Sequence, residues 1–124
     1  MGQENETYLG EKEEELVNLL FGIGIKRNVA KVLVVLAKTP TVTSRAIDQG
    51  TDLSHPEVAT VMQYLKKQGW INSLENKARS KGRPVKIYEL AKPIPEIVSG
   101  IEKEKINKAN DQLQLIQKLR NYVT

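Results

Sequence analysis

Residues 41–71 read TVTSRAIDQGTDLSHPEVATVMQYLKKQGWI. The best-marked helix of the chain lies in this stretch, because Ser54 and Glu57 have the S-x-x-E spacing of a capping box at a helix start. Gly69 suits the left-handed conformation that commonly ends a helix. These signals predict a helix over residues 54–68.

This helix has one apolar face and one polar face. The apolar residues follow the i, i+3, i+4, i+7 spacing of a buried stripe, and they are Val58, Val61, Met62 and Leu65. The other face and its margins carry groups suited to a DNA groove, because Gln bonds adenine and Thr offers a hydroxyl or methyl group. The candidate contact residues are Ser54, His55, Pro56, Ala59, Thr60, Gln63, Tyr64 and Lys67. Solvent exposure without any ligand is the alternative interpretation of this face.

Two helices are predicted in the first third of the chain. The first begins in the Glu-rich stretch 11–15, where carboxylates oppose the helix dipole, and it stops at Gly22 and Gly24. Residues 26–38 are rich in β-branched side chains, yet their apolar positions have helical spacing. The length of this segment and its exit through Pro40 favour a helix over a buried strand.

A short helix is expected between these two helices and the capped helix. Thr43 or Ser44 provides its cap and Gly50 its end. Residues 41–43 form an extended link before it, and residues 51–53 form a tight turn after it.

Residues 70–74 and 85–90 are predicted to be two strands of a hairpin, joined by a long polar loop. Five cations fall within ten residues of this hairpin and no acid interrupts them: Lys77, Arg79, Lys81, Arg83 and Lys86. Such a cluster displaces counterions from DNA, and Arg83 is a candidate for the minor groove. The alternative is a charged loop that only limits aggregation.

The order of helix, helix, short helix, tight turn, capped helix and hairpin is that of a winged helix-turn-helix. Residues 25–90 also resemble archaeal and bacterial winged-helix regulators of the TrmB-like, ArsR and MarR type. Residues 41–71 carry this resemblance together with SKGRPVKIYEL at 80–90, which looks like their Gly-Arg-Pro wing. The resemblance implies a dimer that binds double-stranded DNA through Ser54, His55, Pro56, Ala59, Thr60 and Gln63.

One long C-terminal helix is expected after Pro93 and Pro95, from residue 96 to about 123. A helix of roughly 40 Å is too long to be buried on a domain of this size. Its first part is expected to pack on its own domain and its second part on a partner helix. The predicted dimerisation residues are Ala109, Leu113, Ile116, Leu119 and Val123.

The predicted organisation of the 124 residues has three parts: a flexible acidic tail (1–10), a winged helix-turn-helix domain (11–92) and a dimerisation helix (93–124). The fold class is mainly α with a small β-hairpin wing. Residues 1–15 carry a net charge of −5, so the net charge of +4 for the whole chain leaves +9 for the remainder. A basic domain is a candidate partner of nucleic acid.

Several function classes find no support in the sequence. There are no cysteines and a single histidine, so neither thiol chemistry nor a histidine metal cluster is expected. No nucleophile motif or glycine-rich phosphate loop is present, and we predict no enzyme, cofactor or metal. No stretch approaches the roughly 20 apolar residues of a membrane span, which predicts a cytoplasmic protein.

These observations predict a sequence-specific, homodimeric transcriptional regulator that binds double-stranded DNA. Its recognition helix would enter the major groove and its basic wing would contact phosphates or the minor groove. Two alternatives stay open: a winged-helix adaptor that binds other proteins, and a DNA-coating protein with weak sequence preference.

Overall fold

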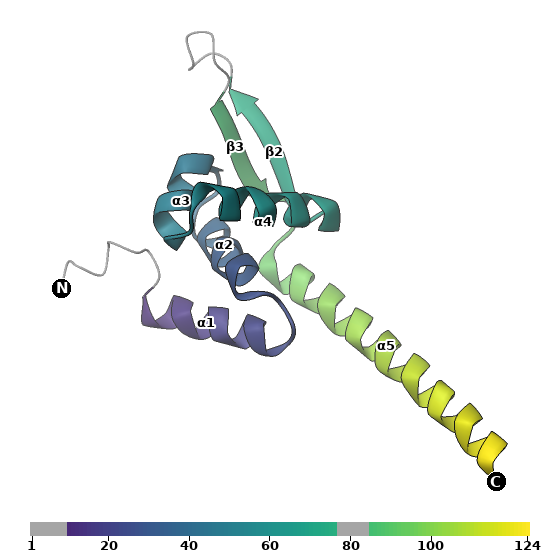
Figure 1. The fold of residues 1–124 in the computed structure, drawn as a ribbon. Helices are drawn as coiled ribbons and strands as arrows, with labels where there is room; N and C mark the ends of the chain where they lie inside the picture. The colour runs from purple at the N-terminus through teal and green to yellow at the C-terminus, as the bar shows by residue number, and fades with distance from the viewer. Residues whose placement is uncertain (1–9, 77–84) are drawn as a thin grey trace. The chain divides into compact units, whose positions relative to one another are not determined.

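The computed structural model describes residues 10–76 and 85–124, in which the chain forms five helices and three strands. Figure 1 shows the fold. The chain divides into two compact units, one that extends to Ala91 and one that begins at Lys92. The elements of the first unit are α1 (Glu11–Gly22), α2 (Arg27–Lys38), β1 (Val42–Thr43), α3 (Ser44–Thr51), α4 (His55–Gln68), β2 (Ile71–Asn76) and β3 (Val85–Leu90). The second unit contains α5 (Ile94–Val123). The predicted flexible tail, apart from Gly10, lies outside the described residues.

Helix α2 forms the centre of the core and contacts α1, α3, α4 and β3. Seven of its twelve residues are buried, namely Val29, Ala30, Val32, Leu33, Val34, Val35 and Leu36. This confirms the prediction of a helix, although four of the seven are β-branched valines. Because the segment is surrounded by packed elements, tertiary contacts outweigh the modest helix propensity of valine.

The end of α3 differs from the prediction. We expected Gly50 to close this helix, but Gly50 is a buried residue inside it and α3 continues to Thr51. The hydroxyl of Thr51 donates to the carbonyl of Ile47 at 2.7 Å, and this bond stays within the helix. Asp52 then adopts the left-handed conformation (φ 65°), and its backbone N–H donates to the carbonyl of Asp48. Aspartate tolerates this conformation better than most residues, so it ends the helix in place of glycine.

The sheet has three antiparallel strands in the order β1-β3-β2. The predicted hairpin is confirmed, and β2 extends two residues beyond its predicted end at 74, so that Asn76 pairs with Val85. The link at 41–43 is more ordered than expected, because Thr43 pairs with Ile87 of β3. The oxygen of the Thr43 side chain also accepts from the backbone N–H of Ala46 and thereby caps α3.

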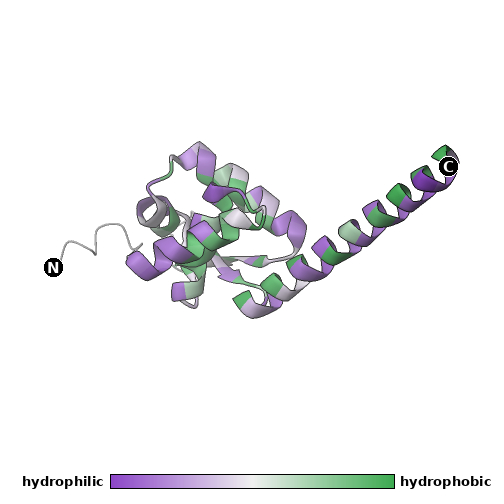
Figure 2. Cartoon of the chain, turned by 90° about the horizontal axis from the view of Figure 1, so that it is seen from below, coloured by the Kyte–Doolittle hydropathy of each residue, from purple (hydrophilic) through white to green (hydrophobic). Residues whose placement is uncertain are grey.

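Helix α5 begins at Ile94, two residues before the predicted start, with Pro95 in its first turn. Hydrophobic and hydrophilic segments alternate along it (Figure 2). Ile97 and Ile101 are buried, whereas every residue from 102 to 124 is exposed. The large exposed apolar side chains of this second part are Ile106, Leu113, Leu115, Ile116, Leu119, Tyr122 and Val123.

Candidate nucleic-acid interface

Helix α4 presents one face to the core and one face to solvent. The four residues predicted to be buried are buried, and they are Val58, Val61, Met62 and Leu65. The eight predicted contact residues are all exposed: Ser54, His55, Pro56, Ala59, Thr60, Gln63, Tyr64 and Lys67. The structure therefore leaves a continuous helical face free of cover by the described part of the first unit.

The start of α4 is held by the predicted capping box. The backbone N–H of Ser54 donates to Glu57 Oε1 at 2.9 Å, and the backbone N–H of Glu57 donates to Ser54 Oγ at 3.3 Å. The pKa of Glu57 is lowered, chiefly by the hydrogen bond from the backbone N–H of Ser54. The Ser54 hydroxyl and the charge of Lys31 lower this pKa further, whereas desolvation raises it. A negative carboxylate thus already occupies the helix N-terminus, where an incoming phosphate would otherwise be attracted.

The turn between α3 and α4 brings two ionisable side chains together. Nδ1 of His55 lies 3.0 Å from Oδ2 of Asp48, so the pair joins the first turn of α4 to α3. The imidazole is 72% exposed, whereas the carboxylate is only 26% exposed. Sequence reasoning named His55 but missed Asp48. The available signal was an acid seven residues before the histidine, on the opposite side of the predicted turn.

The end of α4 is fixed by Gly69 and Trp70. Gly69 has a φ of 76°, which confirms its predicted left-handed conformation. The backbone N–H of the buried Trp70 donates to the carbonyl of Leu65 at 3.1 Å, and the Tyr64 ring meets the Trp70 ring edge-on at 6.0 Å. Tyr64 is therefore oriented by an aromatic neighbour while it stays partly accessible.

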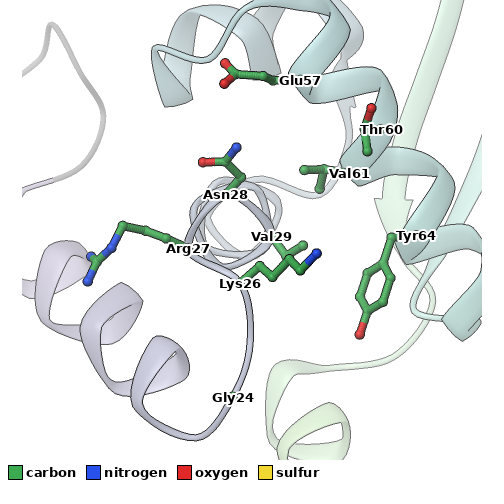
Figure 3. A pocket seen from close by; sticks show the side chains of 9 residues that line it. All are labelled: Gly24, Lys26, Arg27, Asn28, Val29, Glu57, Thr60, Val61 and Tyr64. Atoms are coloured by element: carbon green, nitrogen blue, oxygen red, sulfur yellow. The ribbon is translucent and has the colours of Figure 1, made fainter.

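A pocket of about 580 Å³ opens between α4 and the start of α2 (Figure 3). Its lining residues are Gly24, Lys26, Arg27, Asn28, Val29, Glu57, Thr60, Val61 and Tyr64. The Arg27 side chain is directed away from α4, and its Nη1 donates to Asn18 Oδ1 of α1 at 2.8 Å. Thr60 and Tyr64 thus border this hollow in addition to lying on the exposed face of α4.

The predicted wing is described only in part. Strands β2 and β3 lead into and out of residues 77–84, and Lys86 is exposed on β3. The other four predicted wing cations, Lys77, Arg79, Lys81 and Arg83, lie outside the described residues.

The predicted dimerisation residues of α5 are all exposed, and they are Ala109, Leu113, Ile116, Leu119 and Val123. They recur at intervals of three or four residues, which places them along one side of the helix. In the described ranges, no group of three or more acidic or histidine side chains is placed to hold a metal ion. No helix within these ranges has the length and apolar character needed to cross a membrane.

Comparison with solved structures identifies the fold. The archaeal chromatin protein TrmBL2, whose structure is described as showing a novel mode of DNA binding, superposes on 90% of this chain with a TM-score of 0.72 and 15% identity. This chain spans only 41% of the length of TrmBL2. A possible transcriptional regulator from Methanosarcina mazei Go1 matches with a TM-score of 0.61 and 14% identity, over 77% of this chain and 82% of its own.

The third structure is a MepR–DNA complex from S. aureus, with a TM-score of 0.52 and 15% identity over 90% of both chains. None of these three structures is described as an enzyme. No protein-family model matches the sequence, and the search of curated proteins finds no match. The helical arrangement, the three-stranded antiparallel sheet and these superpositions show that the chain has the winged helix-turn-helix fold of transcriptional regulators.

Proposed function

We propose that this chain is a homodimeric transcriptional regulator that binds double-stranded DNA with sequence preference. The observation that carries the proposal is the exposed face of α4, which lies opposite a fully packed apolar face. A helix of this kind fits the major groove of B-DNA, which is about 12 Å wide. The similarity of the fold to that of a protein solved on DNA supports this assignment.

Gln63 is the side chain best placed to distinguish bases. It is exposed in the middle of α4, and a glutamine amide bonds N6 and N7 of adenine at the same time. Thr60 contributes differently, because its hydroxyl donates to the carbonyl of Pro56 at 3.1 Å. Its methyl group and the remaining acceptor capacity of its oxygen are therefore what it offers to a base edge.

The cations of the wing are proposed to supply most of the affinity. Lys77, Arg79, Lys81, Arg83 and Lys86 form a run of charge without an intervening acid. Contacts between such cations and phosphates release counterions, so the affinity falls steeply as salt is raised. The base sequence of the DNA has little influence on this part of the binding energy.

The second part of α5 is proposed to pair with its counterpart in another copy. Its apolar side chains stay exposed in the single chain, and a sustained apolar stripe on a helix is the pattern of a helix–helix seam. A twofold dimer would place two α4 helices in successive major grooves, about 34 Å apart.

A DNA-coating protein with weak sequence preference is the second candidate. The observation that favours it is the charge distribution on α4, which carries Glu57 in its first turn and no Lys or Arg before Lys66. Bidentate Arg or Lys contacts to guanine, the commonest specific contacts in the major groove, are thus missing from the first three turns.

Selection of bound duplexes from a random pool, followed by competition between a selected and a shuffled duplex, tests the proposal. A regulator prefers the selected duplex by at least about 1000-fold, whereas a coating protein binds both equally. Failure to bind any duplex would reject both candidates and leave the protein-interaction adaptor.

Two sets of variants assign the roles within the interface. Gln63→Ala should change the rank order of selected sequences, while Gln112→Ala on α5 should not. Replacing Arg79, Lys81 and Arg83 with Ala should reduce the slope of log affinity against log salt by about 0.9 for each lost phosphate contact. Replacing Lys103, Lys105 and Lys108 of α5 removes the same charge and should leave that slope unchanged. An unaltered slope in the wing variant contradicts the role of the wing.

A further inference from the structure

The hydrogen-bonded contact between Asp48 and His55 lies directly at the proposed DNA surface. His55 is the first residue of α4 and Asp48 belongs to α3, so the contact bridges both helices of the helix-turn-helix. The two ring nitrogens of histidine point in different directions. With Nδ1 held by Asp48 at 3.0 Å, Nε2 is directed away from the carboxylate on a side chain that is largely exposed.

The carboxylate of Asp48 lies in an environment that does not stabilise it fully. Its Oδ1 atom is buried and has no hydrogen-bond partner among the described residues. A buried carboxylate oxygen without a donor costs folding free energy, and a neutral side chain of the same shape would avoid part of that cost. Locally unfavourable groups of this kind are concentrated at functional sites.

The chemistry of the imidazole defines what this pair can bind. When neutral histidine donates Nδ1–H to a carboxylate, Nε2 carries a lone pair and can only accept. When the ring is protonated, Nε2 also carries a proton, and it donates to an anionic or neutral acceptor while Nδ1–H stays on Asp48. Such charge-assisted hydrogen bonds are roughly twice as strong as neutral ones.

We propose that Asp48 is a positioning residue, which holds the protonated imidazole of His55 so that Nε2–H donates to an acceptor atom of the duplex. The acceptor is a phosphate oxygen or the N7 or O6 atom of guanine, because these share the required chemistry. This inference rests on the proposed DNA-binding function. It adds that DNA binding is accompanied by proton uptake at His55, so affinity rises as pH falls.

The other charged side chains of the adjoining elements include Arg45 on α3, Asp52 in the turn, Glu57 on α4 and Lys31 on α2. The carboxylate of Glu57 is already bound to Ser54. Within the described part of the chain, none of these four side chains forms an ion pair with the imidazole. Asp48 is therefore the group whose removal should alter the behaviour of His55 most directly.

Duplex affinity measured from pH 6 to pH 8 at constant ionic strength tests the proposal on the full chain. The wild-type affinity should fall about tenfold as pH rises, which corresponds to the loss of one charge-assisted hydrogen bond. His55→Gln should bind weakly and with a much flatter pH profile, and Asp48→Asn should approach the same behaviour. Asp52→Asn removes an equal charge from the neighbouring turn and should keep the wild-type profile.

Thermal unfolding separates a positioning role from a structural one. Asp48→Asn should unfold at the same temperature as the wild type or at a higher one, because the buried and unpartnered Oδ1 position then belongs to a neutral amide. A lower unfolding temperature with an unchanged pH profile would overturn the proposal. Calorimetric titration with DNA in two buffers of different ionisation enthalpy should show proton uptake in the wild type that His55→Gln lacks.

The same measurements distinguish failure of this inference from failure of the proposed function. Wild-type protein that binds no duplex at any pH rejects both, whereas binding with equal pH profiles in wild type and His55→Gln rejects only the role of His55. Duplexes with single methylphosphonate or 7-deazaguanine substitutions then identify the acceptor. If the pH dependence is lost with a methylphosphonate duplex, the acceptor is a phosphate oxygen. If it is lost with a 7-deazaguanine duplex, the acceptor is guanine N7.

Discussion

Helices α4 and α5 both carry apolar residues at helical spacing, but the two helices differ in what covers those residues. Leu65 of α4 is completely buried, whereas Leu119 of α5 is 63% exposed. On α4 the apolar stripe is buried over most of its length, while on α5 burial stops at Ile101. Helical spacing therefore predicts that a face is to be covered, but it does not say whether the same chain or another one provides the cover.

The largest effect is expected from charges on the exposed stripe of α5. Leu113→Glu combined with Ile116→Glu should raise the dissociation constant of the proposed dimer by at least about 1000-fold, because two uncompensated carboxylates would be buried in its proposed seam. Sedimentation equilibrium measures this constant. Gln114→Glu combined with Asn121→Glu adds the same charge to another side of α5 and should leave the dimer intact. Equal dissociation in both variants would show that net charge, and not the stripe, is responsible.

The next largest effect sharpens the contrast between the two leucines. Leu65→Ala should reduce the free energy of unfolding by about 2–5 kcal/mol, since it leaves a cavity among packed neighbours. Leu119→Ala should change it by less than about 0.5 kcal/mol at dilutions where the protein is monomeric. Urea titration of both variants checks the difference. A large loss in the Leu119 variant at those dilutions would mean that the single chain buries this residue.

A smaller effect is expected from the cap at the start of α4, compared with a serine inside α5. Ser54→Ala should cost about 1 kcal/mol of unfolding free energy, because the backbone N–H of Glu57 loses its acceptor. Ser99→Ala lies on an exposed position inside α5 and should be neutral or slightly stabilising, since alanine is the better helix former. Urea titration of both serine variants measures the two costs, and similar losses would argue against the cap.

The smallest effect is a dependence of stability on pH from the same cap. The folded-state pKa of Glu57 is lowered from its ordinary value of 4.5, chiefly by the Ser54 backbone N–H. The corresponding stability is present above 4.5 and is lost as pH falls through the lowered folded-state pKa. Glu57→Gln should therefore flatten the acid side of the stability curve, while Glu104→Gln on α5 should not. Thermal unfolding between pH 3 and pH 6 provides the test.

Much of the fold follows from local signals in the sequence. The capping box at Ser54 and the glycine at 69 define α4 because both act within one turn of the helix ends. The end of α3 was predicted wrongly, since glycine commonly ends helices and Gly50 is instead enclosed by the core. The pairing of Thr43 with Ile87 was missed because a two-residue strand has no pattern of its own and depends on a partner distant in the chain.

The site was predictable only where it lies on a periodic element. The exposed face of α4 follows from the positions of Val58 and Leu65, which determine the opposite side. The contact between Asp48 and His55 depends on the turn geometry that Asp52 sets with its positive φ. The sequence alone offers only the spacing of an acid seven residues before a histidine, and this spacing does not fix the turn geometry that brings the two side chains together.

Thr43 has a mechanical consequence, because it links the sheet to the helix pair α3 and α4. Thr43 pairs with Ile87 in the sheet, and its side-chain oxygen accepts the capping hydrogen bond from the backbone N–H of Ala46 at the start of α3. One residue therefore connects the sheet to this helix. A shift of β3 relative to β1 would also displace the first turn of α3. Through the contact between Asp48 and His55, it would displace the imidazole at the start of α4. If the chain binds DNA as proposed, contact of the described strands with a duplex would therefore also affect the orientation of α3 and α4.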